Sequence, residues 1–346
     1  MEQILKSDFS FVTPAFLGGA EQKAELRAPA FKSLLRYWWR IAVSKECGYK
    51  VELIRNKEAH IFGSVFNETL RSKVTISVIE ESQLKTETES PRAWERKIDP
   101  SDRRSGDVVS YLGYGAFSGP SKFAPGRTAI SPREPSSSAA SQNVARIEIG
   151  HRGLNSDQLG ELNRALVLLA NFGSVGNKSR NGFGSFYLAG KSCEELYRNK
   201  NKATSMVSRP ILETVNWPSS IALDENGRLC IWNTSSNKDW LGVMQDYAKI
   251  KKELYQFAKN RASQPNGKTG RDMLGTHLPR FPSQLHFVVR PTKPDFSGYK
   301  GTLVHIPVSQ KEKISQNEVS FWRDIYTKLD NYQNSDSKIK LTREGV

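Results

Sequence analysis

The chain has 346 residues, more than one compact core usually holds, so its length favours two domains. Lys and Arg outnumber Asp and Glu by 51 to 36, which gives a formal net charge of +15 and a pI near 9.6. This excess argues against an ordinary enzyme of small metabolites and favours a polyanionic partner, either nucleic acid or an acidic membrane surface. A charge that only confers solubility is the alternative.

The cysteines and the apolar pattern narrow the choice of partner. Cys47, Cys193 and Cys230 lie far apart and form no Cys-x-x-Cys pair, so neither a disulfide framework nor a zinc site is expected. The N-terminal residues lack the basic and apolar regions of a signal peptide, and no apolar run approaches the ~18 residues of a membrane span. We therefore expect a cytoplasmic protein with no membrane partner.

The first half of the chain alternates between strand and helix patterns. The predicted elements, in chain order, are a strand over 3–12, a helix over 29–47 with Pro29 in its first turn, strands over 73–81, 108–119 and 145–153, an amphipathic helix over 157–172 and a strand over 183–190. This is the β-α-β-β-α-β order of a ferredoxin-like unit. Residues 119–142 are rich in Pro, Gly and Ser and predict a mobile insertion.

The second half repeats this order less clearly. The predicted elements are a strand over 227–234, a long helix over 237–262, a basic glycine-rich loop over 265–276, strands over 283–292 and 299–308 that form a possible hairpin, a helix over 316–332 and a polar tail. The sequence therefore predicts an α+β protein with two tandem ferredoxin-like (RRM-like) domains, 1–190 and 191–346, with loop insertions.

The helix that begins at Pro29 carries two different faces. At 100° per residue, one stripe is apolar and consists of Phe31, Leu34, Leu35, Trp38 and Ala42. A second stripe consists of Lys32, Arg36, Trp39, Arg40 and Val43. An aromatic ring among cations suits phosphate contacts and base stacking, so Trp39 is a candidate to stack on a base. A solvated basic face, with Trp39 packed on neighbouring structure, fits the periodicity equally well.

The loop at 171–186 combines four glycines with two cations. Gly173, Gly176, Gly182 and Gly184 surround Lys178 and Arg180. The spacing matches neither a Walker A loop nor a dinucleotide fingerprint. Glycines let several N–H groups converge on an anion, and we expect a sugar–phosphate backbone there rather than a single nucleotide. A simple helix-to-strand turn is the alternative.

No catalytic motif stands out. The histidines are His60, His151, His277, His286 and His305, and they form no His-Glu-x-x-His motif. His286 and His305 lie in predicted strands, where a structural role is expected. No cofactor or metal site is predicted.

The stretch LRAPAFKSLLRYWWR, residues 26–40, resembles the signature of the RAMP superfamily of CRISPR effector subunits, and in particular the first subunits of the type III-B (Cmr) RNA-targeting complex. The preceding Thr13, Pro14, Gly18 and Gly19, the segment 61–64 and the loop at 173–184 are similar to that family as well. The resemblance is dense over 8–66 and 160–188 and thinner over 200–346. It implies ferredoxin-like domains and a non-catalytic subunit that grips the 3′ part of a guide RNA, and the target RNA, beside other RAMP subunits in antiviral defence.

These considerations predict an RNA surface made from the first helix and the two glycine-rich loops. Its predicted contacts are Arg27, Lys32, Arg36, Trp39, Arg40, Asn177, Lys178, Ser179, Arg180, Asn181, Lys268, Arg271, His277 and Arg280, with Gly18, Gly19, Gly173, Gly176, Gly182 and Gly184 allowing close backbone approach. Lys122, Arg127 and Arg133 are further candidates on the insertion.

Two other functions remain open. A metal-independent endoribonuclease that processes guide RNA, as other RAMP proteins do, would use His151, beside Arg152, and His277. A metabolic enzyme that binds a nucleotide phosphate is the third hypothesis.

Overall fold

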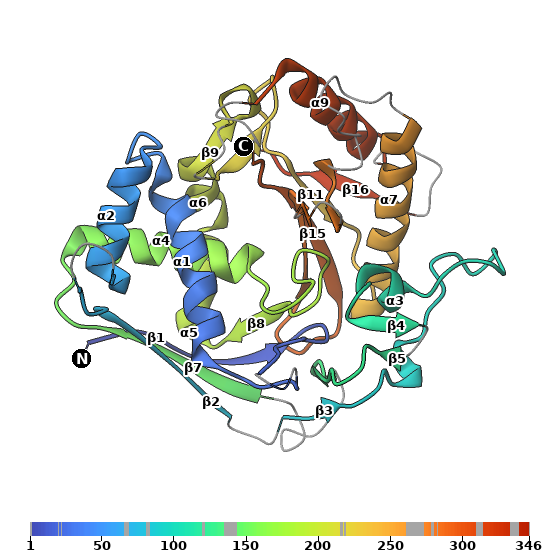
Figure 1. Ribbon diagram of the computed structural model, residues 1–346, viewed down its shortest axis with the longest axis horizontal. Coiled ribbons are helices and arrows are strands. Elements are labelled where there is room, and N and C mark those ends of the chain that lie inside the picture. Colours follow the sequence, from blue (N-terminus) through green and yellow to red (C-terminus); the bar gives the residue numbers. More distant parts are fainter. Residues whose placement is uncertain are drawn as a thin grey trace.

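The computed structural model describes residues 2–19, 21, 23–65, 69–80, 84–119, 122–134, 144–214, 217, 219–260, 273–277, 280–281, 283–308, 314–332 and 339–345. Two four-stranded sheets, each with its helices, make up most of this part of the chain (Figure 1). The predicted α+β class is confirmed. No helix in the described part of the chain combines the length and apolar composition that crossing a bilayer requires.

The first sheet contains β1 (Glu2–Phe11), β2 (Val74–Glu80), β7 (Val144–His151) and β8 (Phe186–Ala189). Its order is β2-β7-β1-β8, and every neighbouring pair is antiparallel. Helices α1 (Ala28–Ser44) and α4 (Ser156–Phe172) pack on each other and cover one face of this sheet, where Phe31 of α1 lies 5.2 Å from Phe9 of β1 between ring centroids. Helix α2 (Val51–Phe62) packs on α1, and the short helices α5 (Lys191–Arg198) and α6 (Lys200–Val207) pack on α4.

The second sheet has the same connectivity. The chain passes through β11 (Ile231–Thr234), α7 (Trp240–Asn260), β14 (Leu285–Pro291), β15 (Tyr299–His305), α9 (Gln316–Asn331) and β16 (Leu341–Arg343). The order β14-β15-β11-β16 is again antiparallel throughout. If the four strands of each sheet are numbered one to four along the chain, both sheets have the spatial order 2-3-1-4.

The segment between β2 and β7 packs against the second sheet's helix. It contains β3 (Thr86–Glu87), η1 (Arg92–Trp94), α3 (Val108–Leu112), β4 (Phe117–Gly119), β5 (Lys122–Phe123) and β6 (Ala129–Ile130). Helix α3 packs on α7, and Arg96 forms two hydrogen bonds to Asp239, at 2.8 and 3.1 Å. This segment between β2 and β7 therefore fastens the first sheet and its helices (the first unit) to the second sheet and its helices (the second unit). Smaller elements of the second half are β9 (Ser208–Pro210), η3 (Ile211–Glu213), β10 (Ile221–Leu223), β12 (Thr276–His277) and β13 (Arg280–Phe281).

Two local predictions are wrong. Residues 108–112 form α3 instead of a strand, because the Asp107 carboxylate accepts the N–H of Ser110 and caps a helix there. The predicted polar tail contains β16, which pairs with β11 and buries Leu341. In the predicted mobile insertion, β6 pairs with β3, and the Arg133 guanidinium lies 4.7 Å from the centre of the Phe296 ring. Residues 135–143 lie outside the described part of the chain.

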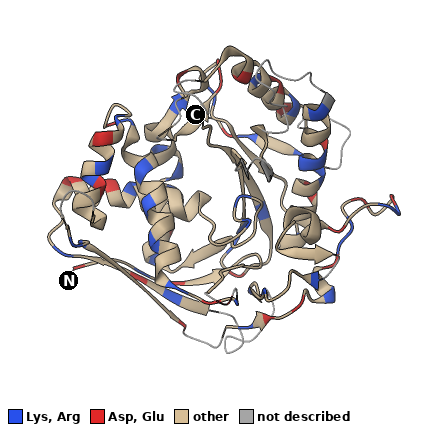
Figure 2. Ribbon diagram, in the orientation of Figure 1, with Lys and Arg blue, Asp and Glu red and all other residues tan. Residues whose placement is uncertain are grey.

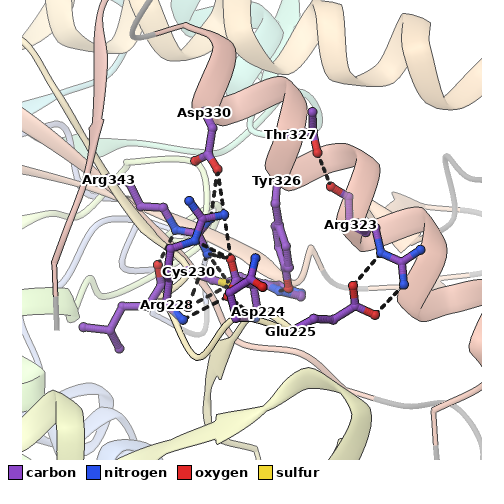
Figure 3. Close-up of polar contacts among 12 residues, drawn as sticks. Asp224, Glu225, Arg228, Cys230, Arg323, Tyr326, Thr327, Asp330 and Arg343 are labelled. Atoms are coloured by element: carbon purple, nitrogen blue, oxygen red, sulfur yellow. Dashed lines mark hydrogen bonds and ion pairs between the residues drawn. The ribbon is translucent and has the colours of Figure 1, made fainter.

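A network of buried charges holds β16 in place (Figure 3). The Arg343 guanidinium pairs with the carboxylates of Asp224 and Asp330, each at 2.9 Å, and donates to the carbonyl oxygen of Leu229 at 2.7 Å. It also lies 5.0 Å from the centre of the Trp232 ring, whose N–H donates to Asp330. Burial alone would raise the pKa of the Asp224 carboxyl, but two backbone N–H groups and the nearby arginines hold that pKa below its ordinary value.

We expect Arg343→Met to lower the free energy of unfolding by about 3 kcal/mol, because it removes the buried cation that pairs with Asp224 and Asp330 and leaves them only the exposed Arg228. The matched control is Arg323→Met, which breaks the exposed pair with Glu225 and should cost at most about 1 kcal/mol. Urea denaturation measures both.

The Asp224 pKa also predicts how the free energy of unfolding changes with pH. Because the folded pKa of Asp224 is depressed, its contribution is complete above the unfolded carboxyl pKa and is lost as pH falls through the folded value. The acid sensitivity of Arg343→Met should be weaker than that of the wild type. Equal destabilisation by the two substitutions would contradict a role for this network.

Candidate nucleic-acid interface

The basic side of α1 faces an open groove. Lys32, Arg36 and Arg40 line it from the helix, and Arg71 and Ser72 line it from the segment just before β2. The groove has a volume of about 630 Å³, and none of the described residues that line it is acidic. Figure 2 shows lysine and arginine recurring along α1. We call this the α1 groove.

A buried carboxylate fixes two of the arginines. Arg36 Nε donates to Glu58 Oε1 at 2.7 Å, and Arg40 donates from Nε and Nη2 to Oε2 and Oε1 at 2.8 and 2.7 Å. Burial pushes the pKa of Glu58 upward, but the hydrogen bonds and charges of Arg40 and Arg36 outweigh it, so the net pKa is lowered and the carboxylate stays ionised. The arginine side chains remain 37 and 33% exposed. Two guanidiniums against one carboxylate leave an excess positive charge on the groove wall.

The predicted stacking position of Trp39 is wrong. Its side chain is 0% exposed and packs against the Phe62 ring of α2, with centroids 5.7 Å apart. The period of α1 correctly separates two stripes, but α2 covers the side on which Trp39 lies. Trp38 is buried as predicted.

The glycine-rich loop lies between α4 and β8, as predicted, but its glycines accommodate the chain itself. A Cβ at Gly176 would lie 2.6 Å from the carbonyl oxygen of Phe16, and a Cβ at Gly173 or Gly184 would overlap the carbonyl oxygens of Leu169 and Val175. The sequence predicts glycines that let a phosphate come close to the loop, but in the structure they let other segments of the protein's own backbone come close.

The polar groups of this loop are also partly occupied. The N–H of Asn177 donates to Phe16 and that of Asn181 to Lys178, which removes two of the five N–H groups predicted to cradle a phosphate. The Asn181 side chain donates to the carbonyl oxygen of Leu112 and accepts from Lys251 Nζ, both at 2.8 Å.

The loop also reaches the second unit. Arg180 Nη1 donates to the carbonyl oxygen of Ser283 at 2.6 Å, and the Arg180 carbonyl oxygen accepts the N–H of Phe287 in β14 at 3.0 Å. One residue further along the loop, Asn181 forms a parallel bridge with Phe287. The loop therefore joins the two sheets.

A second hollow of about 390 Å³ opens where α1, the loop and β14 meet. Its wall includes Ser33 and Tyr37 from α1, Ser179 and Arg180 from the loop, and His286 from β14. Ser33 also lines the α1 groove, so the two depressions adjoin. We call it the junction hollow. The sequence motifs predict Arg180 together with the α1 cations but miss Tyr37 and His286, because nothing in the sequence places β14 beside α1.

The other predicted contacts lie elsewhere. Arg27, just before α1, donates to the carbonyl oxygen of Gly18 at 3.0 Å. A Cβ added at Gly19 would come close only to the side chain of Glu25. Lys268 and Arg271 lie outside the described residues. The backbones of His277 and Arg280 belong to β12 and β13, but their side chains are outside the description.

The histidines do not assemble a catalytic group among the described side chains. His151 is buried, and its Nδ1 accepts the N–H of Leu154 at 3.4 Å. His305 is buried beneath Trp322, with Nδ1 2.6 Å from the Tyr326 hydroxyl. The described residues contain no group of three or more His, Cys, Asp or Glu side chains placed to bind a metal ion.

The family model of the RAMP superfamily matches residues 8–187, more than half of the chain. The chain belongs to the RAMP superfamily. No curated protein sequence matches it.

Two solved structures are similar over nearly the whole length. One is apo Cmr1 from Pyrococcus furiosus, with a TM-score of 0.53, 15% identity and 97% coverage of each chain. The other is a chain of the type III-B Cmr-beta complex bound to cognate target RNA and AMPPnP in the presence of ssDNA, with a TM-score of 0.54, 13% identity and coverage of 95% of this chain and 99% of that one. At these identities the likeness concerns the fold.

The role of the glycines can be tested with a matched pair. Gly184 and Gly153 share a φ of 62°, but a Cβ at Gly153 would meet nothing within 4 Å. We expect Gly153→Ala to cost about 1–2 kcal/mol for its left-handed backbone, and Gly184→Ala a further 1–3 kcal/mol or so for overpacking. Thermal denaturation of the two variants measures the difference. Equal costs would show that packing does not require a glycine at 184.

Proposed function

We propose that this protein is a non-catalytic RNA-binding subunit of a type III-B CRISPR ribonucleoprotein that holds guide and target RNA beside other RAMP subunits. Membership of the RAMP superfamily and the likeness to Cmr1 support this proposal. The second similar chain belongs to a complex bound to target RNA, which supports RNA as the ligand. From the family resemblance, the subunit grips the 3′ part of the guide.

The α1 groove is the observation that carries the proposal. Lys32, Arg36 and Arg40 follow one another along α1 and Arg71 lies in the same open groove, without an acidic residue in its described lining. Such a row fits the regularly spaced phosphates of a nucleic acid better than one small anion. The net charge of +15 favours the same class of partner.

The two sheets of equal connectivity would be tandem ferredoxin-like domains. Helices α5 and α6 pack on α4 of the first unit, whereas β9 pairs with β10 beside the second sheet. We therefore place the boundary near residues 207 and 208, some way after the boundary at 190 that the sequence suggests.

The alternatives find less support in the described geometry. His151, the first candidate for an endoribonuclease, lines neither the α1 groove nor the junction hollow. Within the described residues, the groove that carries the positive charge contains no histidine. The arrangement therefore favours holding RNA over cutting it.

Neutralising two groove cations tests the proposal. We expect Lys32→Gln/Arg71→Gln to weaken binding of single-stranded RNA and to make the slope of log affinity against log salt shallower by about 1.4, at roughly 0.7 for each phosphate that the variant no longer neutralises. Fluorescence anisotropy over a salt series measures both quantities.

The control removes the same charge from another surface. Lys252→Gln/Lys259→Gln changes two exposed residues of α7, and its salt slope should stay close to that of the wild type. If both variants bind RNA as the wild type does, the α1 groove is not the RNA surface.

A further inference from the structure

The junction hollow holds two polar rings that lack hydrogen-bond partners within the described part of the protein. His286 is only 7% exposed, and its ring lies nearly parallel to that of Tyr37, at an angle of 11° and with centroids 6.1 Å apart. Among the described residues, no group forms a hydrogen bond with the His286 imidazole or the Tyr37 hydroxyl, although both side chains line the hollow. His286 is buried and Tyr37 is partly exposed, and both rings line the hollow, so a group that enters it can reach them.

The charge state of the rings suits an uncharged partner with mixed donors and acceptors. Burial, together with Arg180 and His305, holds the pKa of His286 well below its ordinary value. Burial also raises the pKa of the Tyr37 hydroxyl, against the opposing effect of Arg180. At neutral pH the imidazole therefore offers one donor and one acceptor, and the phenol offers both. The edges of nucleobases present this kind of pattern, whereas a phosphate presents acceptors alone.

Arg180 adds a fixed positive charge to the same wall. Its hydrogen bond to the carbonyl oxygen of Ser283 holds the guanidinium in place, and it has no carboxylate partner among the described residues. The hollow, at about 390 Å³, has the size of a small-ligand site. The hollow thus offers the His286 and Tyr37 rings to a base and the Arg180 guanidinium to its phosphate.

The adjoining depressions outline a path for a strand. The cations of the α1 groove and the rings of the junction hollow lie on successive sides of α1, and Ser33 lines both depressions. A strand whose phosphates follow Lys32 and Arg36 would bring its next nucleotides to Ser33 and the hollow. Single-stranded RNA is commonly read in this way, by bases that are turned out of the stack.

We propose that the junction hollow binds one unstacked nucleobase of the RNA, with His286 and Tyr37 contacting the base edge and Arg180 its phosphate. This inference rests on the proposed function. It adds base selectivity to a surface that otherwise recognises only the backbone, and it makes the contact between the two units part of the site.

The test compares the full chain's affinity for oligoadenylate, oligouridylate and oligocytidylate of equal length, each over a salt series. One hydrogen-bonded base contact predicts a preference of about tenfold for one of the three. His286→Ala should reduce that preference to less than about twofold and leave the salt slope unchanged. His286→Gln, which keeps a donor and an acceptor, should retain part of it.

Two further variants separate folding and backbone binding from base selection. Tyr37→Phe removes only a hydroxyl, so it should fold normally and lose part of the preference. Lys32→Gln/Arg71→Gln should do the reverse of His286→Ala, with a shallower salt slope and an intact preference.

The outcomes distinguish the two proposals. Salt-dependent binding without base preference, or a preference that survives both His286→Ala and Tyr37→Phe, overturns the base site and leaves the proposed function standing. Absence of RNA binding by the wild type overturns both.

Discussion

The contact on which the rest of this molecule depends is the packing of the glycine-rich loop, residues 173–185, between the two sheets. Glycine at 184 lets the loop fold back on the carbonyl of Val175, and the N–H of Gly184 then donates to the carbonyl oxygen of Pro14 in the first unit. The next residue, Ser185, accepts the N–H of Val289 from the second sheet at 3.0 Å. A side chain at 184 would collide with the Val175 backbone of the same loop and so displace the Ser185 hydroxyl that contacts the second sheet.

This joint also brings the candidate site together. It holds Arg180 against β14 and so places His286 beside Tyr37 of α1. Glu58 performs a comparable task for the α1 groove, since one buried carboxylate orients two guanidiniums that would otherwise move freely in solvent. In both places a polar contact within the protein positions a cation that solvent can reach. Because these cations are already ordered, binding a polyanion costs less side-chain entropy.

Much of this organisation is predictable from the sequence. Strong periodicity identifies α1, α4, α7 and the strands of the hairpin β14–β15. An apolar stripe along one face can be recognised from the local sequence, whatever element packs against it. The misses share a physical cause. Trp39 is buried by α2, β16 gains its order from β11 and the Arg343 network, and Tyr37 and His286 meet only through the joint between the units. Each depends on long-range packing that no local pattern records. The position of the loop at 173–184 is predicted correctly, but its glycines serve the protein's own backbone.

If the α1 groove and the junction hollow form one RNA surface, bound RNA lies across α1 and the joint between the two units. Photocrosslinking with RNA that carries thiouridine, followed by mass spectrometry of the crosslinked peptides, locates the RNA directly. We expect crosslinks in the peptides that contain Lys32 to Arg40, Arg71 to Ile76 and Ser179 to Arg180, the segments that line the two adjoining depressions. Crosslinks confined to α7 and α9, on the far side of the second sheet from α1 in Figure 1, would contradict this placement.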